Sequence, residues 1–160
     1  MATLKTVRLE SSDGRCFAVD RDAAFLSTFV KNFVGDLGSG SEPILLPNVR
    51  GSILAKVVEY CVHHKHDARL NKEVADLIQD DGVVEAWDRG FMDVDDSTML
   101  QILYAADYLG VEPLVDLGCL FIARIIRHMP VGEIRQRFGV VDDFTSAQRE
   151  QIRHETERLK

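Results

Sequence analysis

The segment from Pro113 to His128 restricts the fold of this chain most, because it predicts a helix that is apolar on two sides. Pro113 suits a first-turn position, where its missing N–H leaves no hydrogen bond unmade. The large apolar residues fall on two faces at helical spacing, with Leu114, Leu117, Phe121 and Ile125 on one and Val115, Cys119, Ile122 and Ile126 on the other. Such a helix has to be buried on both sides. One side can face the chain's own core, and the other requires further elements or a partner.

The residues after this helix offer little cover for its second face. A short amphipathic stretch follows from Pro130 to Phe138, and its large apolar residues are Val131, Ile134 and Phe138. Thr145 and Gln148 then have the spacing of a capping box, which predicts a last helix running to Lys160. The only large apolar residues of that helix are Ile152 and Leu159. A helix this polar is marginal alone, so we expect it to fray in the free protein and to become ordered beside a partner.

The first two thirds of the chain predict a mixture of strands and helices. Alternating residues on either side of the Asp13-Gly14 turn indicate a β-hairpin over residues 6–19. A proline-bracketed apolar run at 43–47 is predicted to be a strand that pairs with this hairpin. Helical periodicity predicts further elements at residues 22–33 (one helix or two short turns), 52–64 and 96–109. The fold class is therefore mixed α/β, of the α+β kind.

Two end signals define the helix at 96–109. The side chain of Asp96 can cap its first turn, and Gly110 follows its last apolar residue. Between residues 66 and 90 the chain is polar and irregular, which predicts a connector containing one helical turn.

Charge and composition exclude several classes of protein. The 160 residues carry a net charge of −7 with a sequence pI near 5.2, and Lys and Arg do not cluster, so we expect no nucleic-acid partner. No apolar leader and no stretch of membrane-spanning length occurs, so we expect a soluble intracellular protein without a membrane partner. Cys16, Cys61 and Cys119 lie among apolar residues without CxxC spacing, which predicts three buried free thiols in a reducing compartment.

Side chains suited to catalysis or metal binding are few. Cys61, His63, His64 and His66 are close in sequence, but His63 points away from the helix face that Cys61 and His64 share. No second Cys/His pair lies at a suitable interval, and histidines in a last helical turn are favoured by the helix dipole in any case. Nucleophile motifs and phosphate-binding loops are also missing from the sequence. We therefore expect no metal site, no cofactor and no enzymatic activity.

Six blocks that together span nearly the whole chain carry a family resemblance. They are VRLESSDGRCFAVD (7–20), LPNV (46–49), KVVEYCVHHK (56–65), WDRGFMDVD (87–95), YAADYLGVEPLVDLGC (104–119) and EIRQRFGVVDDFTSAQREQIRHE (133–155). In this order they resemble the S-phase kinase-associated (Skp) adaptor family of SCF (Skp–cullin–F-box) ubiquitin ligases. Six ordered blocks are far more specific than one short motif.

The resemblance implies a BTB/POZ fold over residues 1–110, which binds a cullin, and a helical extension over 111–160, which binds an F-box. By position, Asp107 and Tyr108 match the cullin-contacting dipeptide of the family, which is usually Asn-Tyr. The positions that fall in the F-box-binding stretch are Leu114, Leu117, Ile134, Phe138 and Ile152. Family members commonly end in Trp-Cys, where this chain has Arg158 and Leu159.

The implied function is that of a non-catalytic adaptor, which bridges a cullin scaffold and F-box receptors in the cytoplasm and nucleus. Its apolar C-terminal surface also allows a homodimer when the protein is free. The alternative hypothesis is a BTB-type structural or chaperone-like protein, which binds F-box proteins or itself outside any cullin ligase.

Overall fold

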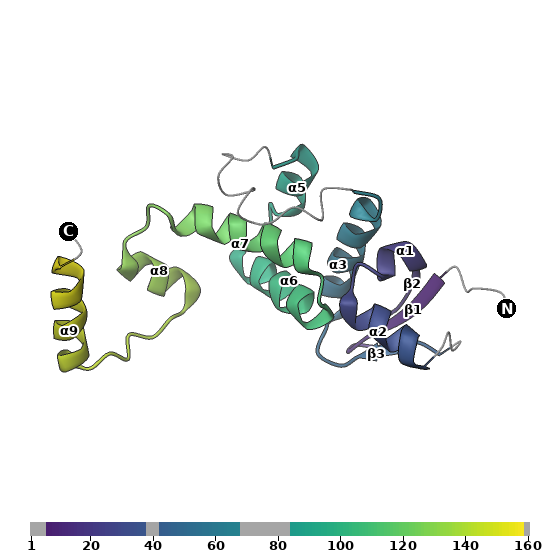
Figure 1. Ribbon diagram of the computed structural model, residues 1–160, viewed down its shortest axis with the longest axis horizontal. Helices are drawn as coiled ribbons and strands as arrows, with labels where there is room; N and C mark the ends of the chain where they lie inside the picture. Colours follow the sequence, from purple (N-terminus) through teal and green to yellow (C-terminus); the bar gives the residue numbers. More distant parts are fainter. Residues whose placement is uncertain (1–5, 38–41, 68–83, 159–160) are drawn as a thin grey trace. The chain divides into compact units, whose positions relative to one another are not determined.

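The computed structural model describes residues 6–37, 42–67 and 84–158. It divides into two compact units, Met1–Arg124 and Ile125–Lys160. Figure 1 follows the elements along the chain, with strands and helices mixed in the first unit and helices in the second.

A three-stranded sheet in the order β2-β1-β3 lies in the first unit (Figure 1). Its strands are β1 (Thr6–Ser11), β2 (Cys16–Asp20) and β3 (Ile44–Leu46). Strand β1 pairs antiparallel with β2, placing Leu9 opposite Phe17, and parallel with β3, placing Leu9 opposite Ile44. Gly14 has a φ of 76° in the hairpin turn, a conformation that glycine adopts without steric cost. The predicted hairpin and its pairing with the third strand are therefore confirmed.

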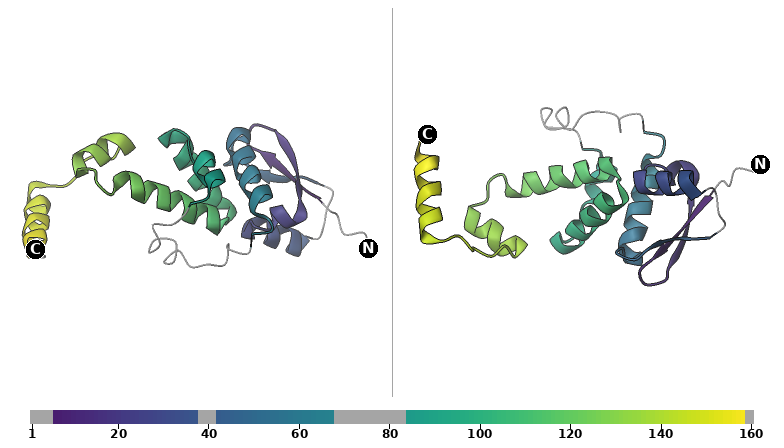
Figure 2. Two further views of the ribbon diagram at one scale, coloured as in Figure 1. Left: turned by 90° about the horizontal axis from the view of Figure 1, so that it is seen from above. Right: turned by 60° about the horizontal axis from the view of Figure 1, so that its bottom comes forward.

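Helices pack against this sheet and against each other. They are α1 (Arg21–Ala24), α2 (Thr28–Leu37), α3 (Gly51–His64), α5 (Ala86–Phe91), α6 (Asp96–Leu109) and α7 (Glu112–Ile126). Helix α3 lies between the sheet and α6 (Figure 2). The segment predicted at 22–33 forms two helices, because Asp20 caps α1 and the Ser27 hydroxyl accepts a hydrogen bond from Val30 N, 3.1 Å away, at the start of α2. Helix α5 lies in the predicted connector, of which residues 68–83 are outside the described part of the chain.

The ends of α6 are set by side-chain and backbone geometry. Its N-cap is Asp95 and not Asp96, because the Asp95 carboxylate accepts a hydrogen bond from Thr98 N at 3.0 Å. The cap was predicted one residue too late because two consecutive aspartates satisfy the same sequence rule. Gly110 ends the helix in the left-handed region with a φ of 63°, as predicted.

The core of the first unit is apolar and includes both the sheet and the first turns of α7. Its largest fully buried side chains include Leu46, Leu54, Met99, Ile102, Leu109 and Leu114. Helix α7 packs closely on α6, because a Cβ added at Gly118 would collide with the side chain of Leu103. The first unit therefore has a hydrophobic core of its own.

The second unit has no comparable core. It contains α8 (Val131–Phe138) and α9 (Ser146–Glu157), and the predicted capping box of Thr145 and Gln148 is present at the start of α9. No residue from Ile125 to Arg158 is buried. The helices of this unit therefore lack the apolar burial that stabilises most helices in proteins.

The three cysteines do not share one environment. Cys61 is buried in α3, but Cys16 and Cys119 are exposed, which corrects the prediction of three buried thiols. Cys16 begins β2 on the outward face of the sheet, and Cys119 lies on the face of α7 that the first unit leaves uncovered. Apolar neighbours in sequence did not identify which face was covered. Within the described ranges, no helix is long and apolar enough to span a membrane.

Candidate interaction surfaces

The predicted cullin-binding residues lie near the end of α6. Asp107 is exposed and Tyr108 is 37 % exposed. The Tyr108 ring packs beside Phe29 of α2, with ring centroids 5.6 Å apart. This contact fixes one side of the Tyr108 ring and leaves the rest of the side chain accessible.

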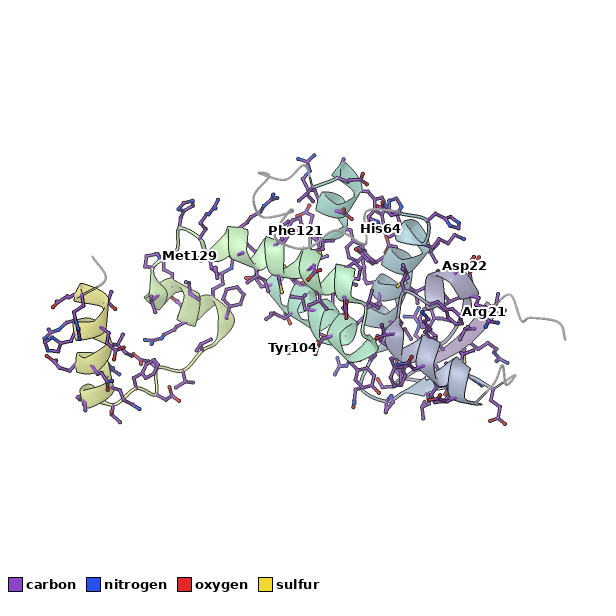
Figure 3. All side chains as sticks on the ribbon, in the orientation of Figure 1. Arg21, Asp22, His64, Tyr104, Phe121 and Met129 are labelled. Carbon is purple, nitrogen blue, oxygen red and sulfur yellow. The ribbon has the colours of Figure 1, made fainter. Side chains whose placement is uncertain are left out.

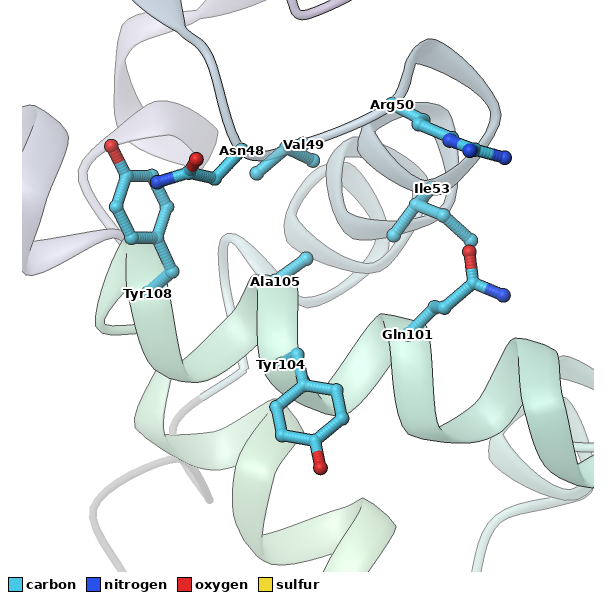
Figure 4. Close-up of a pocket in the computed structure, with 8 residues that line it drawn as sticks. All are labelled: Asn48, Val49, Arg50, Ile53, Gln101, Tyr104, Ala105 and Tyr108. Carbon is cyan, nitrogen blue, oxygen red and sulfur yellow. The ribbon is translucent and has the colours of Figure 1, made fainter.

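A pocket of about 300 Å³ adjoins Tyr108 (Figure 4). It is lined by Asn48, Val49, Arg50, Ile53, Gln101, Tyr104, Ala105 and Tyr108. Tyr104 is 73 % exposed and lies on the same face of α6 as Tyr108 (Figure 4). Tyr104 was not among the predicted cullin-binding residues, although residues four apart on a helix are neighbours on its surface.

Two accessible tyrosines beside a pocket are suited to protein recognition. A tyrosine combines a large apolar ring with a hydroxyl that can exchange hydrogen bonds with water or a partner, and such residues are enriched at protein interfaces. The surface formed by Tyr104, Tyr108 and the pocket is called the tyrosine surface below. It offers binding area for a protein partner.

Two of the five predicted F-box-binding residues belong to the core of the first unit. Leu114 is fully buried and Leu117 is 9 % exposed. In this structure both side chains therefore stabilise α7 and offer no free interface area. The sequence shows that both faces of α7 are apolar, but it does not show which face the rest of the unit covers.

The opposite face of α7 is only partly covered, since Ile122 is half-buried and Cys119 is exposed. Phe121 (Figure 3), which follows Leu117 on the first face, is also half-buried. This part of α7 retains apolar surface that could be buried further, as the doubly apolar pattern predicted.

The other three predicted F-box-binding residues lie in the second unit. Ile134 and Phe138 of α8 are half-buried, and Ile152 of α9 is 45 % exposed. Other large apolar side chains are exposed in the same unit, namely Val131, Val140, Val141 and Phe144. A unit with so much accessible apolar area and no buried residue is a strong candidate for a docking surface.

Polar contacts, not apolar burial, connect α8 to α9 within the second unit. The Asp142 carboxylate lies 2.7 Å from the Arg135 guanidinium of α8 and 3.3 Å from the Arg149 guanidinium of α9. The same Arg135 guanidinium lies over the Phe144 ring, 5.7 Å from its centroid. Exposed ion pairs of this kind typically contribute no more than about 1 kcal/mol each, so the arrangement is held weakly.

The cysteine and histidine cluster does not form a metal site. Burial raises the pKa of the Cys61 thiol to about 12, and His64 contacts the carboxylates of Asp67 and Asp88. His63 instead stacks on Trp87, with ring centroids 3.8 Å apart. Within the described part of the chain, no group of three or more potential ligands is arranged to hold a metal ion.

The fold and these surfaces define a class: a small α/β domain of the BTB/POZ kind, followed by a helical extension that lacks a core of its own. Residues 5–66 match the Skp1 family tetramerisation domain, a POZ domain, and residues 112–159 match the Skp1 family dimerisation domain. The chain belongs to the Skp1 family.

Fungal proteins named "E3 ubiquitin ligase complex SCF subunit sconC" are similar to this chain over nearly their whole length. The protein of Talaromyces marneffei is 40 % identical over 151 residues, covering 94 % of each chain. That of Neosartorya fischeri is 40 % identical over 154 residues, covering 96 % of this chain and 98 % of its own. That of Aspergillus terreus is 40 % identical over 157 residues, covering 98 % of both.

Proposed function

We propose that this protein is a non-catalytic adaptor of an SCF-type ubiquitin ligase, which joins a cullin scaffold to F-box substrate receptors. Membership of the Skp1 family supports the role, as do the names of its relatives. Its mechanism is tethering: two separate interfaces hold a substrate receptor near the ligase scaffold and so raise the local concentration of substrate.

The observation that carries this proposal is the difference between the two units. The first unit buries its own core, whereas no residue between Ile125 and Arg158 is buried. The second unit therefore becomes stable only when a partner covers its apolar side chains. An F-box is the partner that the family membership suggests for this extension.

We assign cullin binding to the tyrosine surface of the first unit. Truncation of Tyr108 to alanine removes a ring with accessible area, and an interface anchor of this kind is worth about tenfold or more in affinity. Tyr108→Ala should therefore weaken cullin binding and leave F-box binding unchanged. Tyr108→Phe keeps the ring contact with Phe29. If Tyr108→Phe and Tyr108→Ala lose the same cullin affinity, the hydroxyl and not the packing of the ring is responsible.

We assign F-box binding to the second unit. Truncation of Ile134 and Phe138 together removes apolar area from α8 without touching the core of the first unit, so this double variant should lose F-box proteins and keep the cullin. Each variant is thus the control for the other in paired binding measurements. If Ile134→Ala/Phe138→Ala retains wild-type affinity for F-box proteins, the receptor surface is misplaced.

Asp107 provides a separate test of the cullin assignment. Its exposed carboxylate stands beside Tyr108 where the family usually has asparagine. Asp107→Asn removes one negative charge and keeps the shape of the side chain, so it should change the affinity for a cullin and the salt dependence of that affinity. An unchanged affinity at low and high salt would place Asp107 outside the interface.

The state of the free protein follows from the same surface. Without a receptor, residues 130–158 either exchange rapidly with solvent or pair with a second copy through their exposed apolar side chains. An F-box peptide should then slow amide hydrogen exchange over 145–158 and dissociate any homodimer. Strong protection of this segment in the isolated monomer, unchanged by the peptide, would contradict coupled folding and binding.

Affinity purification separates the adaptor role from a chaperone-like role outside any ligase. We propose that the protein acts in the cytoplasm and nucleus, where a cullin should be recovered together with F-box proteins. Recovery of F-box proteins from both compartments without a cullin would support the alternative.

A further inference from the structure

His64 is the last residue of α3 and is almost completely buried, with 4 % of its surface exposed. Its ring nitrogens face two carboxylates from different parts of the chain. Nε2 lies 2.9 Å from Oδ1 of Asp88, in α5, and Nδ1 lies 3.4 Å from Oδ2 of Asp67, just beyond α3. The contact between His64 and Asp88 joins residues 24 positions apart in sequence.

This geometry determines the charge that the His64 ring requires. A neutral imidazole has one N–H and one lone pair, so one of its nitrogens would present a lone pair to a carboxylate oxygen. An imidazolium donates through both nitrogens and satisfies both contacts. We propose that His64, as an imidazolium, clasps α5 to the end of α3, and that loss of its proton loosens α5, so that docking of this helix is controlled by pH.

The electrostatics agree with the geometry. Burial by itself lowers the pKa of His64, but hydrogen bonds and charge from Asp88 and Asp67 raise it, and the result is a pKa above the ordinary value of 6.5. A raised folded-state pKa means that the stabilisation is fully present below pH 6.5 and is lost as the pH rises through the folded value.

Other ionisable side chains near the His64 ring have to be considered as causes of a pH effect. Tyr60 stacks at 4.3 Å between ring centroids, but burial, followed by the charge of Asp88, raises the pKa of its phenol, so it stays neutral through neutral pH. Asp116 of α7 contributes to the same shift in the pKa of Tyr60. Among the described residues, His63 is a further titratable ring beside His64, with the two centroids 4.8 Å apart, edge to face. His63 is therefore the residue from which His64 has to be distinguished.

Helix α5 depends on such contacts because it is too short to be stable alone. It has six residues, and helices this short do not persist in water without tertiary contacts. Its aromatic residues Trp87 and Phe91 stack at 5.1 Å, and Phe91 also packs near Tyr60 at 5.7 Å. Release of the clasp would therefore free one end of an aromatic cluster and increase its exposure.

Trp87 is the only tryptophan of the chain, so its fluorescence reports on α5. In the full-length protein, Trp87 emission and amide exchange over 86–91 should change together between about pH 5 and about pH 9, a range that spans ordinary histidine titration. The expected midpoint lies above 6.5. The ring-proton NMR signal of His64 should titrate with the same midpoint.

Three variants separate the clasp from other causes. His64→Gln should abolish the transition in amide exchange over 86–91 and resemble the high-pH wild type throughout. His63→Gln is the matched control, and it should keep that transition although it removes the ring stacked on Trp87. Asp88→Asn removes one carboxylate and should lower the midpoint by about one pH unit or more.

The measurements can overturn the proposal even if one variant folds poorly. A His64 midpoint at or below 6.5 in the wild-type NMR titration would show that the ring is not held as an imidazolium. Loss of the exchange transition in His63→Gln, with its persistence in His64→Gln, would assign the effect to His63. An exchange rate over 86–91 that does not vary with pH beyond its intrinsic chemical dependence would exclude control of α5 by any histidine.

Discussion

Gly110 ends α6 and contacts the start of α2. Its replacement by alanine should destabilise the first unit for two reasons, an unfavourable backbone conformation and a collision with Thr28. Gly110 has a φ of 63°, in the left-handed region. Its carbonyl accepts hydrogen bonds from the backbone N–H and the hydroxyl of Thr28, each at 3.2 Å. A Cβ added at this position would collide with the Thr28 hydroxyl oxygen and lie 3.3 Å from Thr28 Cβ.

The expected cost follows from these contacts. A non-glycine residue in the left-handed region costs about 1–2 kcal/mol. Rotation of the Thr28 hydroxyl away from the new methyl group also breaks its hydrogen bond, which is worth about 0.5–1 kcal/mol. Gly110→Ala should therefore lower the free energy of unfolding by about 1.5–3 kcal/mol. Gly14 is the matched control, because it has a φ of 76° with nothing within 4 Å of an added Cβ, so Gly14→Ala should pay only the conformational cost.

Urea unfolding followed by Trp87 fluorescence and far-ultraviolet circular dichroism measures these differences. In a Thr28→Ala background the collision and the hydrogen bond are both absent, so the cost of Gly110→Ala should decrease by about 1 kcal/mol. If Gly110→Ala is no more destabilising than Gly14→Ala, or if its cost is the same with and without the Thr28 hydroxyl, the steric part of the argument is refuted.

Three further predictions concern thiols, a helix cap and the second unit. A thiol reagent should modify Cys16 and Cys119 quickly and Cys61 only after unfolding, because burial raises the pKa of the Cys61 thiol to about 12; rapid reaction of three thiols in the native state would contradict this. Asp95→Ala should lower the melting temperature at neutral pH. Hydrogen bonds from Thr98 lower the pKa of Asp95 below 3.8 in the folded protein. The difference in melting temperature between wild type and variant should therefore disappear as the pH falls from 3.8 through the pKa of Asp95 in the folded state. Asp142→Asn should speed amide exchange in α9 and make that exchange less sensitive to salt. Unchanged exchange would show that the ion pairs of Asp142 with Arg135 and Arg149 do not order the helix.

The interaction surfaces could be predicted only in part. The doubly apolar pattern of α7 correctly indicated surplus apolar area, but Leu114 and Leu117 proved to be core residues. Periodicity defines which residues share a face, and burial depends on which neighbouring element covers that face. Tyr104 was not predicted for the same reason, because periodicity places it on a face of α6 without showing whether a neighbouring element covers that face.

The sequence by itself determined the local structure of this protein. The turn at Asp13-Gly14, the left-handed end at Gly110 and the capping box at Thr145 depend on a few adjacent residues whose steric and hydrogen-bonding preferences act locally. Only the tertiary structure decided which apolar faces are used for folding and which remain for partners. It also brought Asp88 to His64 across 24 residues. Contacts of this kind depend on packing between distant segments, and no local preference encodes them.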